Sequence, residues 1–267
     1  MEKRRIFEEN DFENPKLTMP PAGIDPKAFV ARHFGTAASN APRKGTTTLA
    51  FVYKGKTPQD KGGVLVFTDT RATGGSMIMM KKIQKILPIS ERIVATLCGG
   101  AGDCVFWVRR TARYAGLYEL REGEPITVSA ASMYLSNELF NYKGMGLSIY
   151  STVAGFDKTG PSIYMVTNDG LRMEGKLFCF GSGSLHAMAI LDGGFAETMT
   201  DEEAVALGRK AIMHATVRDF GSGGRAIGAH ITEAGTEWLE PVDVSEAYYK
   251  VQEQKSRPDF PYLPKIV

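Results

Sequence analysis

The spacing of apolar residues predicts strands first and helices after them. Alternating and β-branched residues favour strands at about 46–53 and 64–69. The polar Gly/Pro/Lys segment 54–63 separates them and is typical of an exposed hairpin loop. Apolar residues at helical spacing then favour helices at 103–119 and 128–142.

The same order repeats in the second half of the chain. Strand-like runs are expected at 148–156, 162–167 and 171–180, and a last strand pair at 226–232 and 237–241. Between them, Thr200-Asp201-Glu202-Glu203 is a capping box that opens a helix. Strands followed by helices, twice, predict an α+β fold with two sheets packed face to face and helices on their outer surfaces.

The composition changes near residue 45, which is the only domain boundary we expect. Residues 1–45 carry prolines at 15, 20, 21, 26 and 42, few β-branched residues and no sustained helical period. We interpret 1–45 as a removable leader and 46–267 as one folded domain. A disordered tail is the alternative, and the two differ only in whether the Gly45–Thr46 bond is hydrolysed.

Composition and charge narrow the class of protein. A chain of 267 residues with 43% hydrophobic content can bury a substantial core. No window approaches the roughly 20 apolar residues of a membrane span, and no apolar signal segment follows the N-terminus. The net charge of +2, with acids and bases interspersed, argues against nucleic acid as a partner.

Cysteine, histidine and methionine give no sign of a metal or cofactor. The three cysteines, Cys98, Cys104 and Cys179, lack C-x-x-C spacing and are interpreted as reduced thiols in the core. The four histidines are scattered, so we expect no metal and no organic cofactor. The methionines at 77, 79 and 80 are expected to pack against other apolar residues.

A threonine run follows Gly45 at the start of the first predicted strand. If the chain is cut after Gly45, Thr46 carries a free α-amine beside its own hydroxyl, which puts a base and a nucleophile on one residue. An α-amine has a pKa of about 7.7 to 8.0, so part of it is unprotonated at neutral pH. In the uncut chain this nitrogen is an amide and is not basic. A plain β-branched strand also fits the run.

Two charged residues and a glycine segment could complete a site around Thr46. Antiparallel pairing of the two first strands brings Asp69 close to Thr46. A buried Lys85 beside Asp69 would favour loss of a proton from a nearby hydroxyl, whereas a solvated lysine would have no such effect. The segment Gly99–Gly102 offers backbone N–H groups to a reacting carbonyl, or forms a tight turn before a helix.

Six segments, in this order, resemble the catalytic beta subunits of the 20S proteasome, a family of N-terminal nucleophile hydrolases. They are Gly45–Phe51, Thr68–Thr73, Leu97–Cys104, Tyr142–Ser148, Gly181–Ser184 and Arg218–Gly224. The resemblance runs from Gly45 to about residue 251. Two motifs, Tyr-Lys-Gly-Met-Gly-Leu-Ser and Gly-Gly-Ala-x-Asp-Cys-x-Phe-Trp, are most similar to the chymotrypsin-like, type-5 member.

The resemblance implies a four-layer αββα sandwich and a threonine peptidase matured by self-cleavage at Gly45–Thr46. The residues that it implies for catalysis are Thr46, Asp69, Lys85, Gly99, Ser182, Asp219 and Ser222. Lys85 and Asp69 would set the electrostatics and Gly99 would bind the oxyanion. Ser182, Asp219 and Ser222 would hold the threonine amine.

The resemblance also implies a substrate pocket and a set of partners. The pocket walls would be Ala72, Thr73, Ile83, Leu97 and Ala101. These residues are small or apolar, which favours large hydrophobic side chains, and Leu97 stands where this subunit type usually has methionine. The partners would be other beta and alpha subunits in stacked seven-membered rings, and the substrate unfolded polypeptide. The expected location is the cytoplasm and nucleus.

Two other functions stay open at this point. Some beta subunits of the family keep the fold without threonine chemistry, so the chain could be a silent structural subunit. It could also be an N-terminal nucleophile amidase acting on small molecules. The presence of Gly45, Thr46, Asp69 and Lys85 favours a catalytic subunit, and the apolar pocket favours a peptide substrate.

Overall fold

The computed structural model describes residue 28 and residues 45–74 and 77–255. Apart from residue 28 and Gly45, the predicted leader 1–45 lies outside the described residues, as do the last twelve residues of the predicted domain, 256–267. Within the described part of the chain, no helix is long and apolar enough to cross a membrane.

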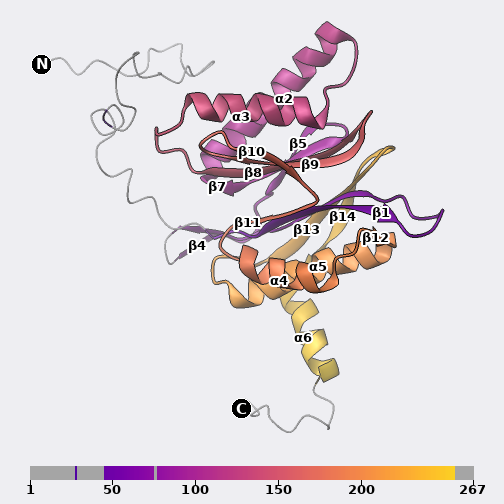
Figure 1. Cartoon of the computed structure of the whole chain (residues 1–267). Coiled ribbons are helices and arrows are strands. Elements are labelled where there is room, and N and C mark those ends of the chain that lie inside the picture. The colour runs from indigo at the N-terminus through magenta and orange to yellow at the C-terminus, as the bar shows by residue number, and fades with distance from the viewer. Residues whose placement is uncertain (1–27, 29–44, 75–76, 256–267) are drawn as a thin grey trace, which may run out of the picture.

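Two mainly antiparallel sheets form the centre of the fold (Figure 1). The first contains, in order, β11 (Leu177–Phe180), β1 (Thr48–Gly55), β2 (Gly63–Asp69), β13 (Arg225–Thr232) and β14 (Gly235–Asp243), with β12 (Thr198–Met199) beside β1. The second contains β10 (Arg172–Gly175), β9 (Gly160–Thr167), β8 (Ile149–Asp157), β6 (Ile93–Thr96) and β5 (Ile86–Ser90), with β7 (Cys98–Gly99) beside β8. A separate hairpin pairs β3 (Ala72–Gly74) with β4 (Met77–Met80).

Helices cover the outer face of each sheet (Figure 1). α2 (Ala101–Glu122) and α3 (Val128–Asn141) lie on the second sheet, and α4 (Ser184–Gly194) and α5 (Asp201–Arg218) lie on the first. α6 (Val244–Lys255) follows β14 and contacts α5. The predicted α+β fold and its four-layer αββα order are therefore confirmed.

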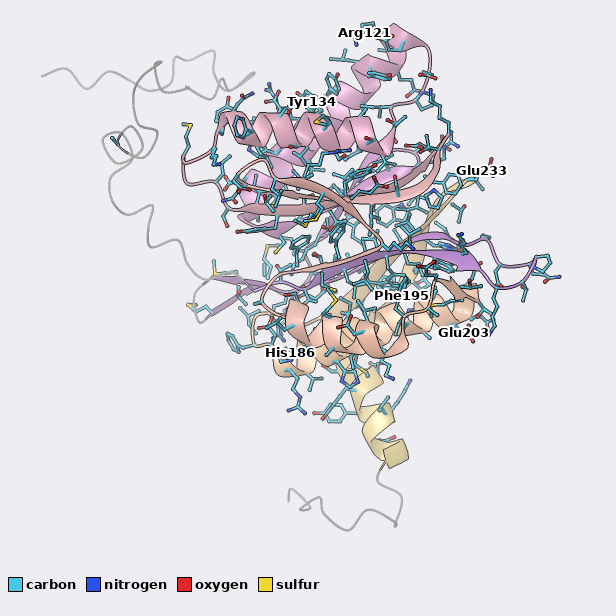
Figure 2. All side chains as sticks on the ribbon, in the orientation of Figure 1. Arg121, Tyr134, His186, Phe195, Glu203 and Glu233 are labelled. Carbon is cyan, nitrogen blue, oxygen red and sulfur yellow. The ribbon has the colours of Figure 1, made fainter. Side chains whose placement is uncertain are left out.

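Successive side chains of the first strands point to opposite faces, so one strand contributes to two hydrophobic cores. In β1, Leu49 and Phe51 face α4 and α5, where Phe195 packs edge-on against Phe51 with ring centroids 5.7 Å apart (Figure 2). Ala50 points the other way, into the layer between the two sheets, together with Val66 of β2. Because both faces are covered, every residue of β2 is buried. This hairpin is the rigid support on which Thr46 lies.

Local sequence signals explain where α5 begins. The Thr200 side chain accepts a hydrogen bond from the Glu203 N–H, and the Glu203 carboxylate accepts one from the Thr200 N–H, as the predicted capping box requires. Glu203 lies at the start of the helix in Figure 2. The acidic residues in the first turn also stabilise the helix, because they lie at the positive end of the helix dipole.

One predicted strand was wrong. The run 171–180 was expected to be continuous, but it divides at Lys176 into β10 and β11, which belong to different sheets. Gly175 permits the crossing, since a Cβ there would lie 2.5 Å from the Phe178 ring. Eight further elements of the described chain were not predicted from the sequence: β3, β4, β5, β6, β7, β12, α4 and α6.

Candidate active site

The pairing of β1 with β2 brings the start of one strand beside the end of the other. The register pairs Thr48 with Thr68, so the next residues outward, Thr47 and Asp69, also lie opposite each other. The Asp69 N–H donates to the Thr47 carbonyl at 3.1 Å, and the Thr47 N–H donates to Asp69 Oδ1 at 2.9 Å. The hairpin therefore fixes the Asp69 carboxylate next to the residue that follows Thr46.

Lys85 joins this carboxylate to the Thr46 hydroxyl. Its Nζ donates to Asp69 Oδ1 at 2.7 Å and to Thr46 Oγ1 at 3.0 Å. Lys85 is only 4% exposed and Asp69 is fully buried. Burial lowers the pKa of the Lys85 ammonium, while the charge of Asp69 acts in the opposite direction. A positive charge at this position would stabilise negative charge on the Thr46 oxygen.

Backbone groups hold the Asp69 carboxylate in place. Oδ2 accepts hydrogen bonds from the N–H of Arg71 and from the N–H of Gly223, both at 3.0 Å. Together with the bond from Thr47, three backbone donors surround a buried anion, and Lys85 supplies the matching charge. This satisfies the requirement that a buried carboxylate be paired and hydrogen-bonded.

The bond predicted to be cut lies directly against the threonine hydroxyl. Thr46 Oγ1 donates to the Gly45 carbonyl oxygen at 2.6 Å. The Gly45 N–H donates to Thr73 Oγ1 at 2.7 Å, which fixes the peptide from its other side. The Thr46 nitrogen is an amide here, and it donates to Ser182 Oγ at 3.2 Å.

A second group of polar side chains lies on the nitrogen side of Thr46. Ser182 and Ser222 each donate to Asp219 Oδ2 at 2.6 Å. Ser222 does not reach Thr46 directly: its hydroxyl lies 2.7 Å from the hydroxyl of Thr47. Of the three residues expected around the amine, Ser182 makes the contact, while Asp219 and Ser222 hold Ser182 and Thr47.

All five predicted wall residues line one cavity of about 290 Å³ beside Thr46. They are Ala72, Thr73, Ile83, Leu97 and Ala101. A larger cavity of about 460 Å³, lined in part by Arg225 and Trp238, shares Ile83 and Gln84 with it but is not lined by Thr46. The smaller, mainly apolar cavity is therefore the candidate binding pocket.

Gly99 is glycine for a steric reason. Its φ is +119°, and a Cβ there would lie 2.1 Å from the Ser148 carbonyl oxygen. The neighbouring Gly100 N–H already donates to that oxygen at 2.6 Å. Gly99 lines the cavity beside Thr46, so it is the better placed of the two to face a reacting carbonyl.

Part of the pocket was not predicted from the sequence. Met79, Met80, Gln84, Cys104 and Val105 also line it. The methionines were expected to pack, but Met77, Met79 and Met80 are 67%, 67% and 54% exposed, so that expectation was wrong. Apolar residues on a short hairpin that follows directly after the Ala72 wall are the signal that could have placed them at the pocket.

Cys98 lies near the lysine but is a poor nucleophile. Burial raises the pKa of its thiol to about 11, although the charge of Lys85 acts in the opposite direction. The thiol therefore stays protonated near neutral pH. Within the described residues, no group of three or more His, Cys, Asp or Glu side chains is placed to hold a metal ion.

Comparison with known proteins agrees with this geometry. The αββα sandwich of two sheets between two helix layers is the fold of N-terminal nucleophile hydrolases. The family model described as "Proteasome subunit" matches residues 43–231, so the chain belongs to the proteasome subunit family.

Relatives within this family support the predicted type. Proteasome subunit pbs-5 of Caenorhabditis elegans is 50% identical over 256 residues, which cover 95% of this chain and 89% of the relative. Proteasome subunit beta type-5 of Dictyostelium discoideum is 41% identical, covering 88% and 85%. Proteasome subunit beta type-5-A of Arabidopsis thaliana is 44% identical, covering 77% and 73%. The predicted resemblance to type-5 beta subunits is confirmed.

Proposed function

We propose that the chain is a threonine endopeptidase subunit of the 20S proteasome whose nucleophile is the hydroxyl of Thr46. One observation carries the proposal: the buried Lys85 Nζ lies 3.0 Å from Thr46 Oγ1, and the same hydroxyl lies 2.6 Å from the carbonyl oxygen of Gly45. A nucleophile, a stabilising cation and the bond to be cut thus meet in one place.

The first reaction is removal of residues 1–45. Thr46 Oγ bonds to the carbonyl carbon of Gly45, the C–N bond breaks, and the hydroxyl proton ends on the released nitrogen. Water then hydrolyses the ester, which frees the Gly45 carboxylate and restores the Thr46 hydroxyl. The product is a domain that begins at Thr46 and carries a free α-amine.

The mature subunit uses this amine as its general base. The amine takes the Thr46 hydroxyl proton as the oxygen attacks a substrate carbonyl, an acyl-enzyme forms, and water hydrolyses it. Lys85, paired with Asp69, stabilises charge on the oxygen, and the Gly99 N–H receives the oxyanion. Ser182 binds the amine. Asp219 accepts hydrogen bonds from both Ser182 and Ser222 and so keeps Ser182 in place.

The pocket and the family membership support a proposal for the substrate and the setting. Ala72, Thr73, Ile83, Leu97 and Ala101, which are small or apolar, line a cavity of about 290 Å³, so the peptide is cut after large hydrophobic residues. A charged side chain would be left desolvated and unpaired there. The subunit works with other beta and alpha subunits in stacked rings, acts on unfolded polypeptides, and is located in the cytoplasm and nucleus.

Substitution of Thr46 by alanine tests the nucleophile. In assembled particles whose other active subunits are inhibited, Thr46→Ala should lower hydrolysis of a hydrophobic reporter peptide by about 10³-fold or more. Thr48→Val is the matched control, because the buried Thr48 hydroxyl has no hydrogen-bond partner among the described residues. Parental activity of Thr46→Ala would instead support the silent-subunit hypothesis.

A further inference from the structure

The residue before the candidate nucleophile lies unusually close to a glycine far away in the sequence. A Cβ added to Gly45 would lie 1.9 Å from Gly221 Cα, and a Cβ added to Gly221 would lie 2.4 Å from Gly45 Cα. Carbon atoms in van der Waals contact lie about 3.5 to 4.0 Å apart. Neither position can carry a side chain while the two backbones stay where they are.

Both backbones are fixed by hydrogen bonds. The Gly45 N–H is bound to Thr73 Oγ1 at 2.7 Å. The Gly221 N–H donates to Asp219 Oδ1 at 3.1 Å, and the preceding carbonyl, that of Phe220, accepts from Arg71 Nη1 at 3.0 Å. Gly45 is therefore held between Thr73 and the loop that contains Gly221, and neither side yields without losing a contact.

We infer that Gly221 is a positioning residue for cleavage of the Gly45–Thr46 bond. The absence of a side chain at Gly221 lets Gly45 lie where its carbonyl oxygen is 2.6 Å from the Thr46 hydroxyl. A methyl group at position 221 pushes Gly45, and with it the carbonyl, away from the hydroxyl. This inference rests on the proposed self-cleavage.

The effect is specific to the uncut chain. Once Gly45 has left, the nearest remaining neighbours of a Cβ at position 221 are Ser182 Oγ at 3.0 Å and Asp219 Oδ2 at 3.4 Å. These are side-chain atoms that shift by a few tenths of an ångström. Gly221 is also not among the described glycines with positive φ, so alanine there changes the available space and leaves the backbone unstrained.

The test compares two forms of Gly221→Ala. In the full chain, we follow the appearance of the Thr46 N-terminus during particle assembly by intact mass, and expect conversion to slow by roughly 10- to 100-fold. In the second form, the chain starts at Thr46 because an N-terminal fusion has been removed by a separate protease. There, Gly221→Ala should keep at least about a third of the parental peptidase turnover, since only side-chain neighbours remain.

Gly116→Ala is the control, because Gly116 lies within α2 and a Cβ there meets no atom within 4 Å. It should convert at the parental rate. Conversion of Gly221→Ala at the parental rate overturns the inference. So does an equal loss in both forms, which would mean a general structural defect. If the parental chain is not cut after Gly45 at all, the proposed function itself fails, and this result is distinct from the other two.

Discussion

The β1–β2 hairpin holds a carboxylate at each of its ends, and only one of them belongs to the candidate site. At one end, Asp69 accepts backbone N–H groups and the Lys85 ammonium. At the other, Asp201 accepts the Tyr53 hydroxyl at 2.6 Å and the N–H groups of Lys61 and Gly62 at 2.9 and 3.1 Å. Both carboxylates therefore anchor the same two strands.

The difference lies in what each carboxylate is paired with. Lys85 connects Asp69 to the Thr46 hydroxyl, which in turn donates a hydrogen bond to the Gly45 carbonyl oxygen. The partner of Asp201, Tyr53, also lies 3.0 Å from Nε2 of the buried His230. Among the described contacts of Asp201, no cation connects its carboxylate to a hydroxyl that could act as a nucleophile. Backbone hydrogen bonds to a carboxylate therefore stabilise the hairpin at both ends. A catalytic site also needs a cation and a nucleophile, which Lys85 and Thr46 supply only at the Asp69 end.

The hairpin loop 54–63 lies at the Asp201 end of the hairpin. Asp60 of the loop accepts the Asp201 N–H at 3.0 Å, and Lys61 forms an ion pair with Glu237 at 3.0 Å. The segment 54–63 therefore folds back onto the start of α5 and onto β14, at the opposite end of the hairpin from Thr46. The loop therefore lies away from the candidate site.

Among the variants that test the comparison of the two ends, neutralising the carboxylate at the site should have the largest effect. Asp69→Asn keeps the shape of the side chain but removes the charge that pairs with Lys85, so hydrolysis of a hydrophobic reporter peptide should fall by about 10²- to 10³-fold. The matched change at the other end, Asp201→Asn, should leave turnover within about twofold. Equal losses from the two variants would contradict the distinction between the two ends.

The opposite pattern is expected for stability at the other end. Asp201→Ala removes three hydrogen bonds to a carboxylate and should lower the free energy of unfolding by about 1 to 3 kcal/mol, measured by thermal unfolding of the full chain. Peptidase activity at temperatures where the particle stays folded should persist. A stable Asp201→Ala variant without activity would show that this end also takes part in the chemistry.

The stability effect of Asp201 should depend on pH. Burial alone would raise the pKa of Asp201, but hydrogen bonds from Tyr53 and from the Lys61 and Gly62 N–H groups outweigh it and lower the pKa below the ordinary value of an aspartate. The stabilisation is therefore complete above the unfolded-state pKa and is lost as pH falls through the lowered folded-state value. The difference in unfolding free energy between parental chain and Asp201→Ala should shrink in that acidic range, and a constant difference would contradict the ion's role.

The smallest effect is expected in the pocket. Leu97 is 7% exposed and lines the cavity beside Thr46. Leu97→Met conserves volume but adds flexibility, so kcat/KM for bulky aromatic peptides relative to branched aliphatic ones should change severalfold, within about tenfold. Stability should change little. An unchanged ratio over a panel of fluorogenic peptides would exclude Leu97 as a determinant of preference.

Much of the fold and the site could be predicted because the signals are local or follow from strand pairing. The capping box at Thr200 fixed the start of α5, and antiparallel pairing of 46–53 with 64–69 placed Asp69 near Thr46. Lys85 needed the family resemblance, because nothing local distinguishes it from Lys81 and Lys82. Its burial depends on strands that pair far along the chain.

The features that could not be predicted depend on tertiary packing. The division at Lys176 follows from the presence of a second sheet that competes for the same run of residues. The contact between Gly45 and Gly221 joins segments distant in sequence, and no local pattern encodes it. The hydrogen bond of Ser222 to Thr47, and not to Thr46, likewise depends on how distant segments pack.

The mass of the chain isolated from assembled, active particles tests the central claim most directly. Self-cleavage at Gly45–Thr46 predicts a chain that begins at Thr46 in the parental particle and an uncut Gly45–Thr46 bond in Thr46→Ala. A parental chain that hydrolyses hydrophobic peptides while residues 1–45 remain attached would contradict it.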